Sequence, residues 1–261
     1  MTRGLIGYTG FVGSNLQQQR GFDELYNSKN FREMSKKSFS ELVCSGIYAE
    51  KWRANKEPAQ DSASIQELIN ILKTVHTDRF VLISTIDVYP VIQGKDENYD
   101  CHQKTNHAYG TNRLLFEDFC TQHFPNCYVV RLPGLFGRGL KKNIIFDLLN
   151  NNMLESINPS STLQYYYLNN LWSDIEKAIL SEISLINLFT EPIATYEIVK
   201  RFFPQKSIGN DAVQECHYDL QTCHSHIYGK NGPYRHSKEE VMIQMQEFVD
   251  YEISNLQYSM G

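Results

Sequence analysis

Two short segments of the sequence carry side chains that could move a proton. Thr85 and Asp87 lie in residues 83–90 (ISTIDVYP), and Tyr109 and Arg113 lie four residues apart in a later segment. Residues four apart on a helix share one face, so a phenol and a permanent cation would meet the same ligand. A phenol with an ordinary pKa of about 10 works near neutral pH when a positive charge stabilises the phenolate. The two segments therefore predict an acid–base site.

A glycine-rich turn, GYTGFVG at residues 7–13, stands near the start of the sequence. It follows a strand-like stretch at 4–7 and leads into a helix-like stretch at 14–20. Such glycines allow a tight strand-to-helix turn, close approach of the backbone to a pyrophosphate, and close helix-on-strand packing, with the phosphate at the helix N-terminus. The turn predicts dinucleotide binding by Gly7, Thr9, Gly10, Phe11, Val12 and Gly13.

The residues after the second strand-like stretch bear on the choice of dinucleotide. An acidic residue there would bind the adenosine ribose hydroxyls of NAD. The sequence instead has Asn27, Ser28 and Lys29, which offer amide, hydroxyl and ammonium donors. These groups can hydrogen-bond a 2′-phosphate, and no carboxylate is present to repel it. We therefore expect NADP as the cofactor, with NAD as the alternative. The alternative is a polar loop whose lysine faces solvent.

Strand-like and helix-like stretches alternate along the first half of the sequence. This order is typical of parallel βαβ units. It predicts an α/β fold with a doubly wound parallel (Rossmann) sheet, in which ligands bind at the carboxyl ends of the strands. The expected strands are 4–7, 24–27, 41–44, 79–85, 128–132, 165–168 and 184–189, and the expected helices are 14–20, 62–76, 109–123 and 237–253.

Composition excludes several classes of protein. The chain has 261 residues, 41% of them hydrophobic, with 25 basic and 30 acidic side chains and a formal net charge of -5. This charge provides no basic surface for nucleic acid. No stretch is long and apolar enough for a membrane span, and no apolar leader opens the sequence, so we expect a soluble cytoplasmic protein. The six cysteines are spread over a chain that can build its own core, which favours free thiols.

The ordered set of motifs resembles the extended short-chain dehydrogenase/reductase family, which includes NAD(P)-dependent nucleotide-sugar epimerases, dehydratases and reductases. The resemblance covers most of residues 1–180. It rests on the glycine turn, the Ser-Thr-x-x-Val-Tyr stretch at 84–89, the helix led by Tyr109, and the segments RLPGLFG at 131–137 and YYYLNNL at 165–171.

The resemblance implies a role for each matching residue. Tyr109 would be the proton donor or acceptor at a sugar hydroxyl or carbonyl, and Thr85 would hydrogen-bond the same oxygen. Arg113 would hold the nicotinamide ribose and lower the pKa of Tyr109. Further positions implied at the cofactor are Ser84 and Pro133, and at the substrate Asp87 and Tyr89. A homodimer built on helices such as 109–123 is a further implication.

Two departures from the family pattern narrow the reaction. The family's usual motif is Tyr-x-x-x-Lys, whereas this chain carries Arg113, which keeps the charge but gives up no proton. Family members that dehydrate a sugar carry an Asp-Glu pair after the active-site threonine, and here Ile86 and Asp87 stand there, which disfavours a 4,6-dehydratase. Reduction or epimerisation of a nucleotide-linked sugar remains. The alternatives are a dinucleotide-binding regulatory protein with little or no catalysis and a reductase of small carbonyl compounds.

Two polar segments outside these motifs are also candidates for binding sites. Lys141, Lys142 and Asn143 would suit a nucleotide diphosphate, or form only a solvated turn. His224 lies in a segment rich in cysteine and histidine, where it would touch substrate. Cys216 and Cys223 are too widely spaced for the usual zinc pairs and have no second cluster, so we predict no metal site.

The motif order also predicts how the chain divides. Residues 1–139 and about 162–190 would form the NAD(P)-binding Rossmann domain. Residues about 140–161 and 191–261 would form a small α/β substrate-binding lobe. The expected partner is a small molecule, a nucleotide sugar, with no nucleic acid and no membrane.

Overall fold

The computed structural model describes residues 1–47, 50–209 and 214–259. The chain forms two compact units. Unit 1 comprises Met1–Val91, Glu97–Leu132 and Asn170–Asn187, and unit 2 comprises Ile92–Asp96, Pro133–Asn169 and Leu188–Gly261.

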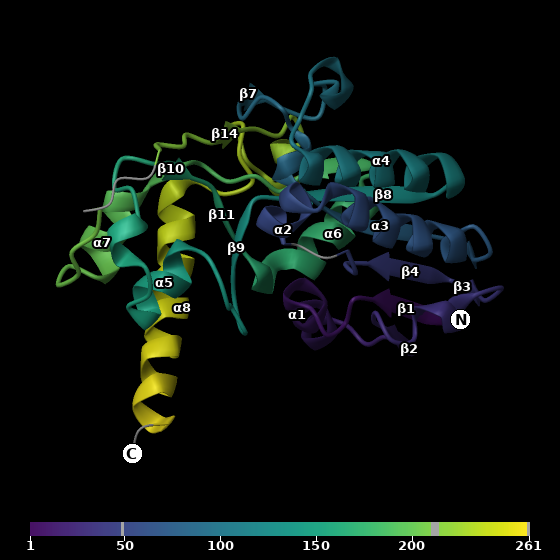
Figure 1. The fold of residues 1–261 in the computed structure, drawn as a ribbon, viewed down its shortest axis with the longest axis horizontal. Helices are drawn as coiled ribbons and strands as arrows, with labels where there is room; N and C mark the ends of the chain where they lie inside the picture. The colour runs from purple at the N-terminus through teal and green to yellow at the C-terminus, as the bar shows by residue number, and fades with distance from the viewer. Residues whose placement is uncertain (48–49, 210–213, 260–261) are drawn as a thin grey trace. The chain divides into compact units, whose positions relative to one another are not determined.

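Unit 1 is built on a six-stranded sheet in the order β12-β8-β6-β4-β1-β2, in which every neighbouring pair is parallel (Figure 1). The two-residue strands β3 (Ser38–Phe39) and β5 (His76–Thr77) form a separate parallel pair. The strands of the sheet are β1 (Arg3–Ile6), β2 (Glu24–Tyr26), β4 (Glu41–Cys44), β6 (Phe80–Thr85), β8 (Cys127–Leu132) and β12 (Leu185–Asn187).

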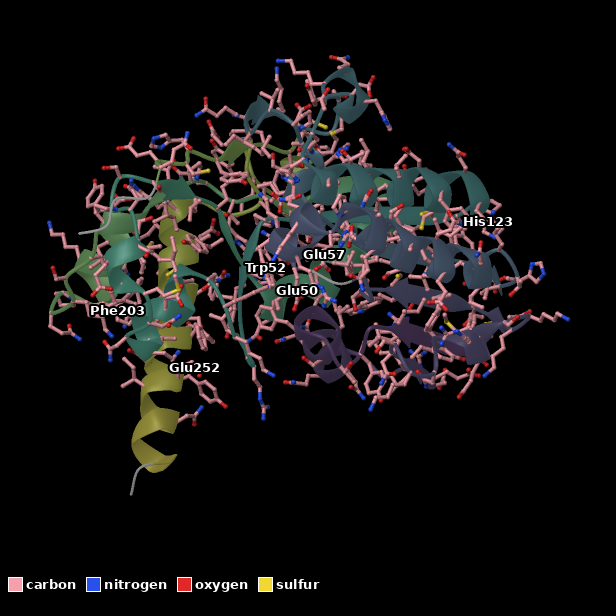
Figure 2. The ribbon with its side chains drawn as sticks, in the orientation of Figure 1. Glu50, Trp52, Glu57, His123, Phe203 and Glu252 are labelled. Carbon is pink, nitrogen blue, oxygen red and sulfur yellow. The ribbon has the colours of Figure 1, made fainter. Side chains whose placement is uncertain are left out.

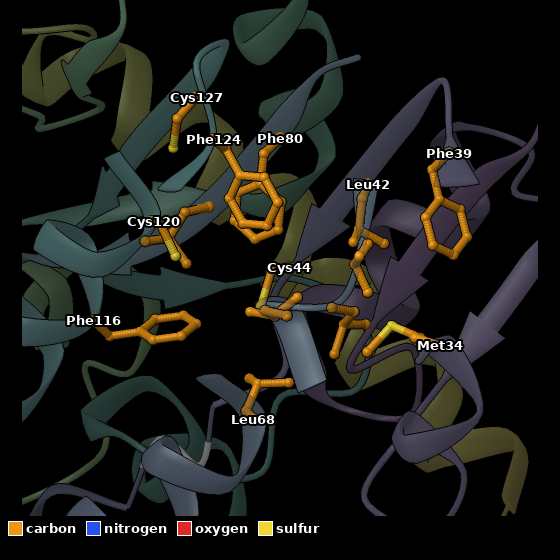
Figure 3. Close-up of a cluster of buried hydrophobic side chains, with 14 of the residues drawn as sticks. Met34, Phe39, Leu42, Cys44, Leu68, Phe80, Phe116, Cys120, Phe124 and Cys127 are labelled. Atoms are coloured by element: carbon orange, nitrogen blue, oxygen red, sulfur yellow. The ribbon is translucent and has the colours of Figure 1, made fainter. Parts of the chain in front are cut away.

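Apolar side chains bury both faces of this sheet. Leu42 and Phe80 pack under one helical layer, in a cluster that Figure 3 shows with Leu68 of α3 and Phe116 of α4. Their neighbour Val43 points to the opposite face and is also fully buried. Helices on both faces explain why these strands are apolar throughout rather than alternating. The helices of unit 1 are α1 (Phe11–Gln19), α2 (Lys51–Lys56), α3 (Pro58–Leu72), α4 (Ala108–His123) and α6 (Leu171–Leu180).

The chain changes direction within the sheet between β1 and β4. From β1 it runs to β2 on one side, and then it returns to form β4 on the other side of β1. In open α/β sheets, ligands bind outside the carboxyl ends of the strands at such a switch point. The glycine turn lies at this point, directly after β1.

Unit 2 contains three two-stranded ladders around its own core. β9 (Gly134–Phe136) pairs in parallel with β11 (Tyr165–Tyr167), β10 (Thr162–Leu163) pairs antiparallel with β13 (Ile193–Ala194), and β7 (Gln93–Lys95) pairs in parallel with β14 (Asp219–Leu220). Its helices are α5 (Ile144–Asn150), α7 (Thr195–Phe202) and α8 (Lys238–Ser259). Buried residues from these elements form one cluster, which includes Phe136, Leu148, Ile198 and Phe248.

The predicted α/β fold with a doubly wound parallel sheet is confirmed. The domain boundaries differ from the expected ones. Segments 133–139 and 162–169 lie in unit 2, because β9 and β11 pair with each other and Phe136 stacks on Tyr167. The predicted lobe at 191–261 includes 210–213 and 260–261, which lie outside the described residues. Among the helices that the structure describes, none has the length and apolar character to cross a membrane.

Candidate active site

The glycine turn forms a tight backbone cradle at the carboxyl end of β1. Gly7 has a φ of +87°, and a Cβ on it would lie 2.5 Å from the Cα of Gly46, the second residue after β4. A Cβ on Gly13 would lie 2.1 Å from the Gly7 carbonyl oxygen. Helix α1 begins after Gly10, which brings no capping side chain to the first N–H groups of the helix. Such a helix start, flanked by bare backbone, fits a pyrophosphate.

The loop after β2 folds on its own side chains. Asn27 Oδ1 accepts a hydrogen bond from the Lys29 N–H at 2.8 Å, and Asn27 Nδ2 donates to the Tyr8 hydroxyl at 3.3 Å. Ser28 and Lys29 are exposed. The loop therefore presents a hydroxyl and an ammonium group to solvent beside the glycine turn.

Thr85 and Tyr109 come together because α4 packs closely on the end of β6. Thr85 is the last residue of β6, and its Oγ1 accepts from the Asp87 N–H at 3.1 Å, which starts a 3₁₀ turn at Ile86–Val88. A Cβ on Gly110 would lie 2.2 Å from the Asp87 carbonyl oxygen, so glycine is required there for this approach. Tyr109 N–H donates to Asn55 Oδ1 at 2.9 Å, which ties the start of α4 to α2.

The phenol of Tyr109 is buried, with 6% of the residue exposed. Burial raises its pKa, and the charge of Asp87 adds to that rise. The charge of Arg113 and hydrogen bonds with Arg113 and Thr85 lower the pKa, but the net direction is upward. The contribution of Arg113 to the Tyr109 pKa therefore has the expected downward sign, whereas burial sets the net direction. Desolvation of the phenolate outweighs the cation.

Arg113 lies on the same face of α4 as Tyr109, as its spacing predicts, and its guanidinium carbon is 4.3 Å from the centre of the Tyr109 ring. Both terminal nitrogens also donate to Asp61 of α3, Nη1 to Oδ2 at 2.8 Å and Nη2 to Oδ1 at 2.9 Å. Asn112 Nδ2 donates to the same carboxylate at 2.8 Å. Burial raises the pKa of Asp61, but these hydrogen bonds and the Arg113 charge hold it below its usual range.

Asp87 lies in a small cluster of charged groups. Lys51 Nζ of α2 donates to Asp87 Oδ1 at 2.6 Å, and His107 Nε2 lies 3.8 Å from the same oxygen. His107 caps α4, since its Nδ1 accepts from the Gly110 N–H at 3.0 Å, so the neutral ring carries its proton on Nε2. Burial raises the pKa of Asp87, but His107 and Lys51 outweigh it and lower the pKa.

Ser84, which is half-buried, and Tyr89, which is buried, belong to one polar network. Ser84 Oγ donates to Glu117, and Arg131 Nη2 donates to Glu117 Oε2 at 2.7 Å. The Tyr89 hydroxyl accepts from Arg131 at 2.9 Å, and the residue is 2% exposed. The hydroxyls of Ser84 and Tyr89 both have hydrogen-bond partners within the protein. A cofactor contact by Ser84 and a substrate contact by Tyr89 stay predictions.

The remaining predicted residues lie in unit 2. Pro133 directly follows β8 and is buried. Asn143 caps α5, with its Oδ1 accepting from the Phe146 N–H at 3.1 Å and its Nδ2 donating to the Leu135 carbonyl at 2.8 Å. The His224 N–H donates to Thr222 Oγ1 at 3.1 Å. A substrate contact by Asn143 or His224 stays a prediction, and Asn143 has a structural role in any case.

A cavity of about 220 Å³ lies beside the ion pair between Arg113 and Asp61. Glu50, just before α2, and Glu57, which joins α2 to α3, both line it (Figure 2). Asp61 also lines it, and 9% of the Asp61 side chain is exposed.

Sequence reasoning missed three residues of this site, namely Gly46, Lys51 and Asp61. One signal was present for Asp61, since a buried arginine requires a partner of opposite charge. The sequence does not say which of the 30 acidic residues it is. His107 stands in the position of a helix cap, but histidine is not a preferred capping residue.

Comparisons with known proteins support the fold. No protein-family model matches the sequence, and a comparison with curated proteins found no match. A dTDP-4-dehydrorhamnose reductase from Bacillus anthracis, solved in complex with NADP, superposes with a TM-score of 0.68 at 16% identity, over 89% of this chain and 94% of that chain. MoeE5, solved with UDP-glucose and NAD, gives 0.67 at 13% identity over 100% of both chains. A UDP-glucose 4-epimerase from Thermotoga maritima, solved with UDP-glucose, gives 0.60 at 12% identity over 91% of this chain and 89% of that chain. The chain therefore has the same fold as these three proteins.

Proposed function

We propose that this protein is an NAD(P)-dependent oxidoreductase or epimerase that acts on a keto or hydroxy group of a nucleotide-linked sugar, with Tyr109 as the acid–base group. The observation that carries the proposal is the convergence of Thr85, Tyr109 and Arg113 at the carboxyl edge of the sheet. The glycine cradle after β1 opens at the same edge. An acid–base phenol beside a dinucleotide cradle is the arrangement that hydride transfer at a carbon–oxygen bond requires.

The glycine turn would hold the pyrophosphate of the dinucleotide against the first N–H groups of α1. Asn27, Ser28 and Lys29 would meet the adenosine ribose, and the absence of a carboxylate among them favours NADP over NAD. When bound, the nicotinamide supplies or accepts a hydride at the substrate carbon. Tyr109 then gives a proton to the oxygen on that carbon or takes one from it, and Thr85 hydrogen-bonds the same oxygen.

The class of substrate rests on the solved structures of the same fold. Their names specify dTDP-4-dehydrorhamnose reductase and UDP-glucose 4-epimerase. Unit 2 would be the substrate-binding lobe of this chain. Ile86, at the position after Thr85, supplies no proton, which agrees with reduction or epimerisation and not with dehydration.

The test begins with the dinucleotide. Mass spectrometry of the purified protein identifies any retained dinucleotide, and titration with NADPH and NADH measures the preference. Keto-sugar nucleotides and UDP-glucose are then offered, with UDP, GDP and dTDP as competitors. The proposal expects tighter binding of NADPH and turnover of at least one sugar nucleotide. A protein that binds no dinucleotide, or reduces only carbonyl compounds without a nucleotide, would contradict it.

The ion pair between Arg113 and Asp61 favours a second candidate, a dinucleotide-binding regulatory protein. In that case Arg113 holds α4 to α3 through Asp61, and Tyr109 transfers no proton. Arg113→Lys separates the two candidates. A gain of turnover would indicate an enzyme retuned by arginine, whereas tight binding without hydride transfer in both forms would favour the regulatory protein.

A further inference from the structure

The cation of the candidate site is paired with a carboxylate that lies on a different helix. Arg113 and Asp61 are joined by two hydrogen bonds of 2.8 and 2.9 Å. The exposed fraction is 5% for the Arg113 side chain and 9% for the Asp61 side chain. A planar guanidinium that meets a carboxylate through both terminal nitrogens has a fixed orientation. Asp61 therefore sets both the place of the guanidinium over the Tyr109 ring and the net charge of the pair, which is zero.

A neutral pair changes what the phenol can do. A lone cation beside a phenol stabilises the phenolate and suits a base that removes a proton from an alcohol. A cation whose charge is balanced gives less stabilisation, and Tyr109 is also buried and close to the negative charge of Asp87. These conditions favour the phenol with its proton in place.

We propose that Asp61 is a positioning residue that fixes the guanidinium of Arg113 over the Tyr109 ring and balances its charge, so that Tyr109 keeps its proton until a carbonyl oxygen takes it. The inference rests on the proposed function and assigns Asp61 a part in it. In the direction of reduction the substrate is a keto-sugar nucleotide, and the same groups act in reverse on the alcohol. A reduced nicotinamide dinucleotide supplies the hydride to the carbonyl carbon, the carbonyl π electrons move to the oxygen, and that oxygen takes the Tyr109 proton. Solvent then returns a proton to the phenolate.

The charged and titratable groups around Tyr109 come from five elements. Asp61 on α3 acts through Arg113. The 3₁₀ turn contributes Asp87, whose charge is countered by Lys51 of α2. On α4 itself, the His107 ring centre lies 6.3 Å from that of Tyr109. Glu117, two turns along α4, is paired with Arg131 of β8. Removal of the Asp61 carboxylate leaves the charge of Arg113 without its counter-charge. The pairs Lys51–Asp87 and Arg131–Glu117 stay intact.

The test measures the proton of Tyr109 directly and needs no cofactor. The protein is labelled with ¹³C at the tyrosine Cζ, and Tyr109→Phe identifies the Tyr109 signal among the 16 tyrosines. Asp61→Asn exposes the phenol to an unbalanced cation, so its titration midpoint should fall by about one pH unit. Arg113→Gln should raise the midpoint. The double variant removes both charges and should titrate close to the parent. Glu67→Gln, which removes a carboxylate elsewhere on α3, should have no effect.

Turnover supplies the second readout. The upper limb of the pH profile for ketone reduction should move to lower pH in Asp61→Asn, by about the same one pH unit as the titration midpoint. If Asp61→Asn does not fold, the Tyr109 titration midpoint of Arg113→Gln is compared with that of the double variant. Loss of the Asp61 carboxylate should lower the midpoint in this comparison too. An unchanged or raised midpoint would overturn the inference. Absence of turnover with the expected midpoints would overturn the proposed function alone.

Discussion

Gly13 offers a direct test of the backbone cradle that would hold the pyrophosphate. It lies in the first turn of α1, where the helix passes the end of β1. A Cβ added there would lie 2.1 Å from the Gly7 carbonyl oxygen and 2.9 Å from the Cα of Tyr8. Both neighbours are backbone atoms, so no side chain can rotate away. Gly13→Ala therefore requires α1 to move from β1 by roughly 1 Å.

The magnitude follows from two opposing effects. Alanine in a helix gains about 1 kcal/mol over glycine. Overpacking against backbone costs about 3 kcal/mol at the upper end of its usual range, so the variant should lose about 2 kcal/mol of unfolding free energy. Gly21→Ala is the matched control, because a Cβ there meets nothing within 4 Å. Gly21→Ala should raise the unfolding free energy by no more than about 1 kcal/mol.

Urea denaturation followed by tryptophan fluorescence reports unit 1 alone, since both tryptophans, Trp52 and Trp172, lie in it. Titration with NADPH measures the cradle itself. A 1 Å displacement of the helix start should weaken NADPH binding at least tenfold in Gly13→Ala and leave Gly21→Ala unchanged. Equal stability and equal affinity in the two variants would refute the account of the cradle.

Three further predictions concern charge. Burial raises the pKa of Glu240, but its hydrogen bonds with Lys230 and Ser237 hold that pKa at about 2. Glu240 therefore contributes to the unfolding free energy above its unfolded pKa, which is near 4.5, and this contribution is lost as pH falls towards 2. Glu240→Gln should therefore lower the urea midpoint of unit 2 at pH 7, followed by circular dichroism, and the deficit should close as pH falls from about 4.5 to about 2. Glu239→Gln should show no such pattern. Glu117→Gln removes the carboxylate that pairs with the buried Arg131, and it should lower the unfolding free energy of unit 1 by about 3 kcal/mol or more. Tryptophan fluorescence measures this change, and an unchanged unfolding free energy would contradict the role of the buried pair. Asn27→Asp places a carboxylate after β2 and should shift the ratio of NADPH to NADH affinity at least tenfold towards NADH, and an unchanged ratio would exclude this loop from the ribose site.

The sheet could be predicted from the sequence because its strands are short apolar runs separated by helical periodicity. Glu41–Cys44 has the expected bounds. Helix α3 begins at Pro58 and not at the expected residue 62, since proline suits the first turn of a helix. Helix α1 begins at Phe11, inside the glycine turn, because Gly10 is its N-cap. Helices α2, α5 and α7 were not predicted.

The site was predictable only where its parts lie close in sequence. Tyr109 and Arg113 share a face because of helical spacing, and Thr85 ends its strand as its motif predicts. Asp61 is 52 residues from its partner Arg113, and only the packing of α3 on α4 brings them together. Tyr89 belongs to the Ser-Thr-x-x-Val-Tyr stretch, and its hydroxyl accepts a hydrogen bond from Arg131. Arg131 is 42 residues away, so the local sequence does not show this contact.

The central claim is that Tyr109 exchanges the proton at the reacting oxygen. The most direct measurement is the rate of nicotinamide-dependent turnover of Tyr109→Phe, on a sugar nucleotide that the parent converts, with Tyr196→Phe as the control at a residue that is 55% exposed. Loss of a positioned acid–base group should lower kcat by about 100-fold or more while dinucleotide affinity is retained. Full turnover by Tyr109→Phe would contradict the mechanism.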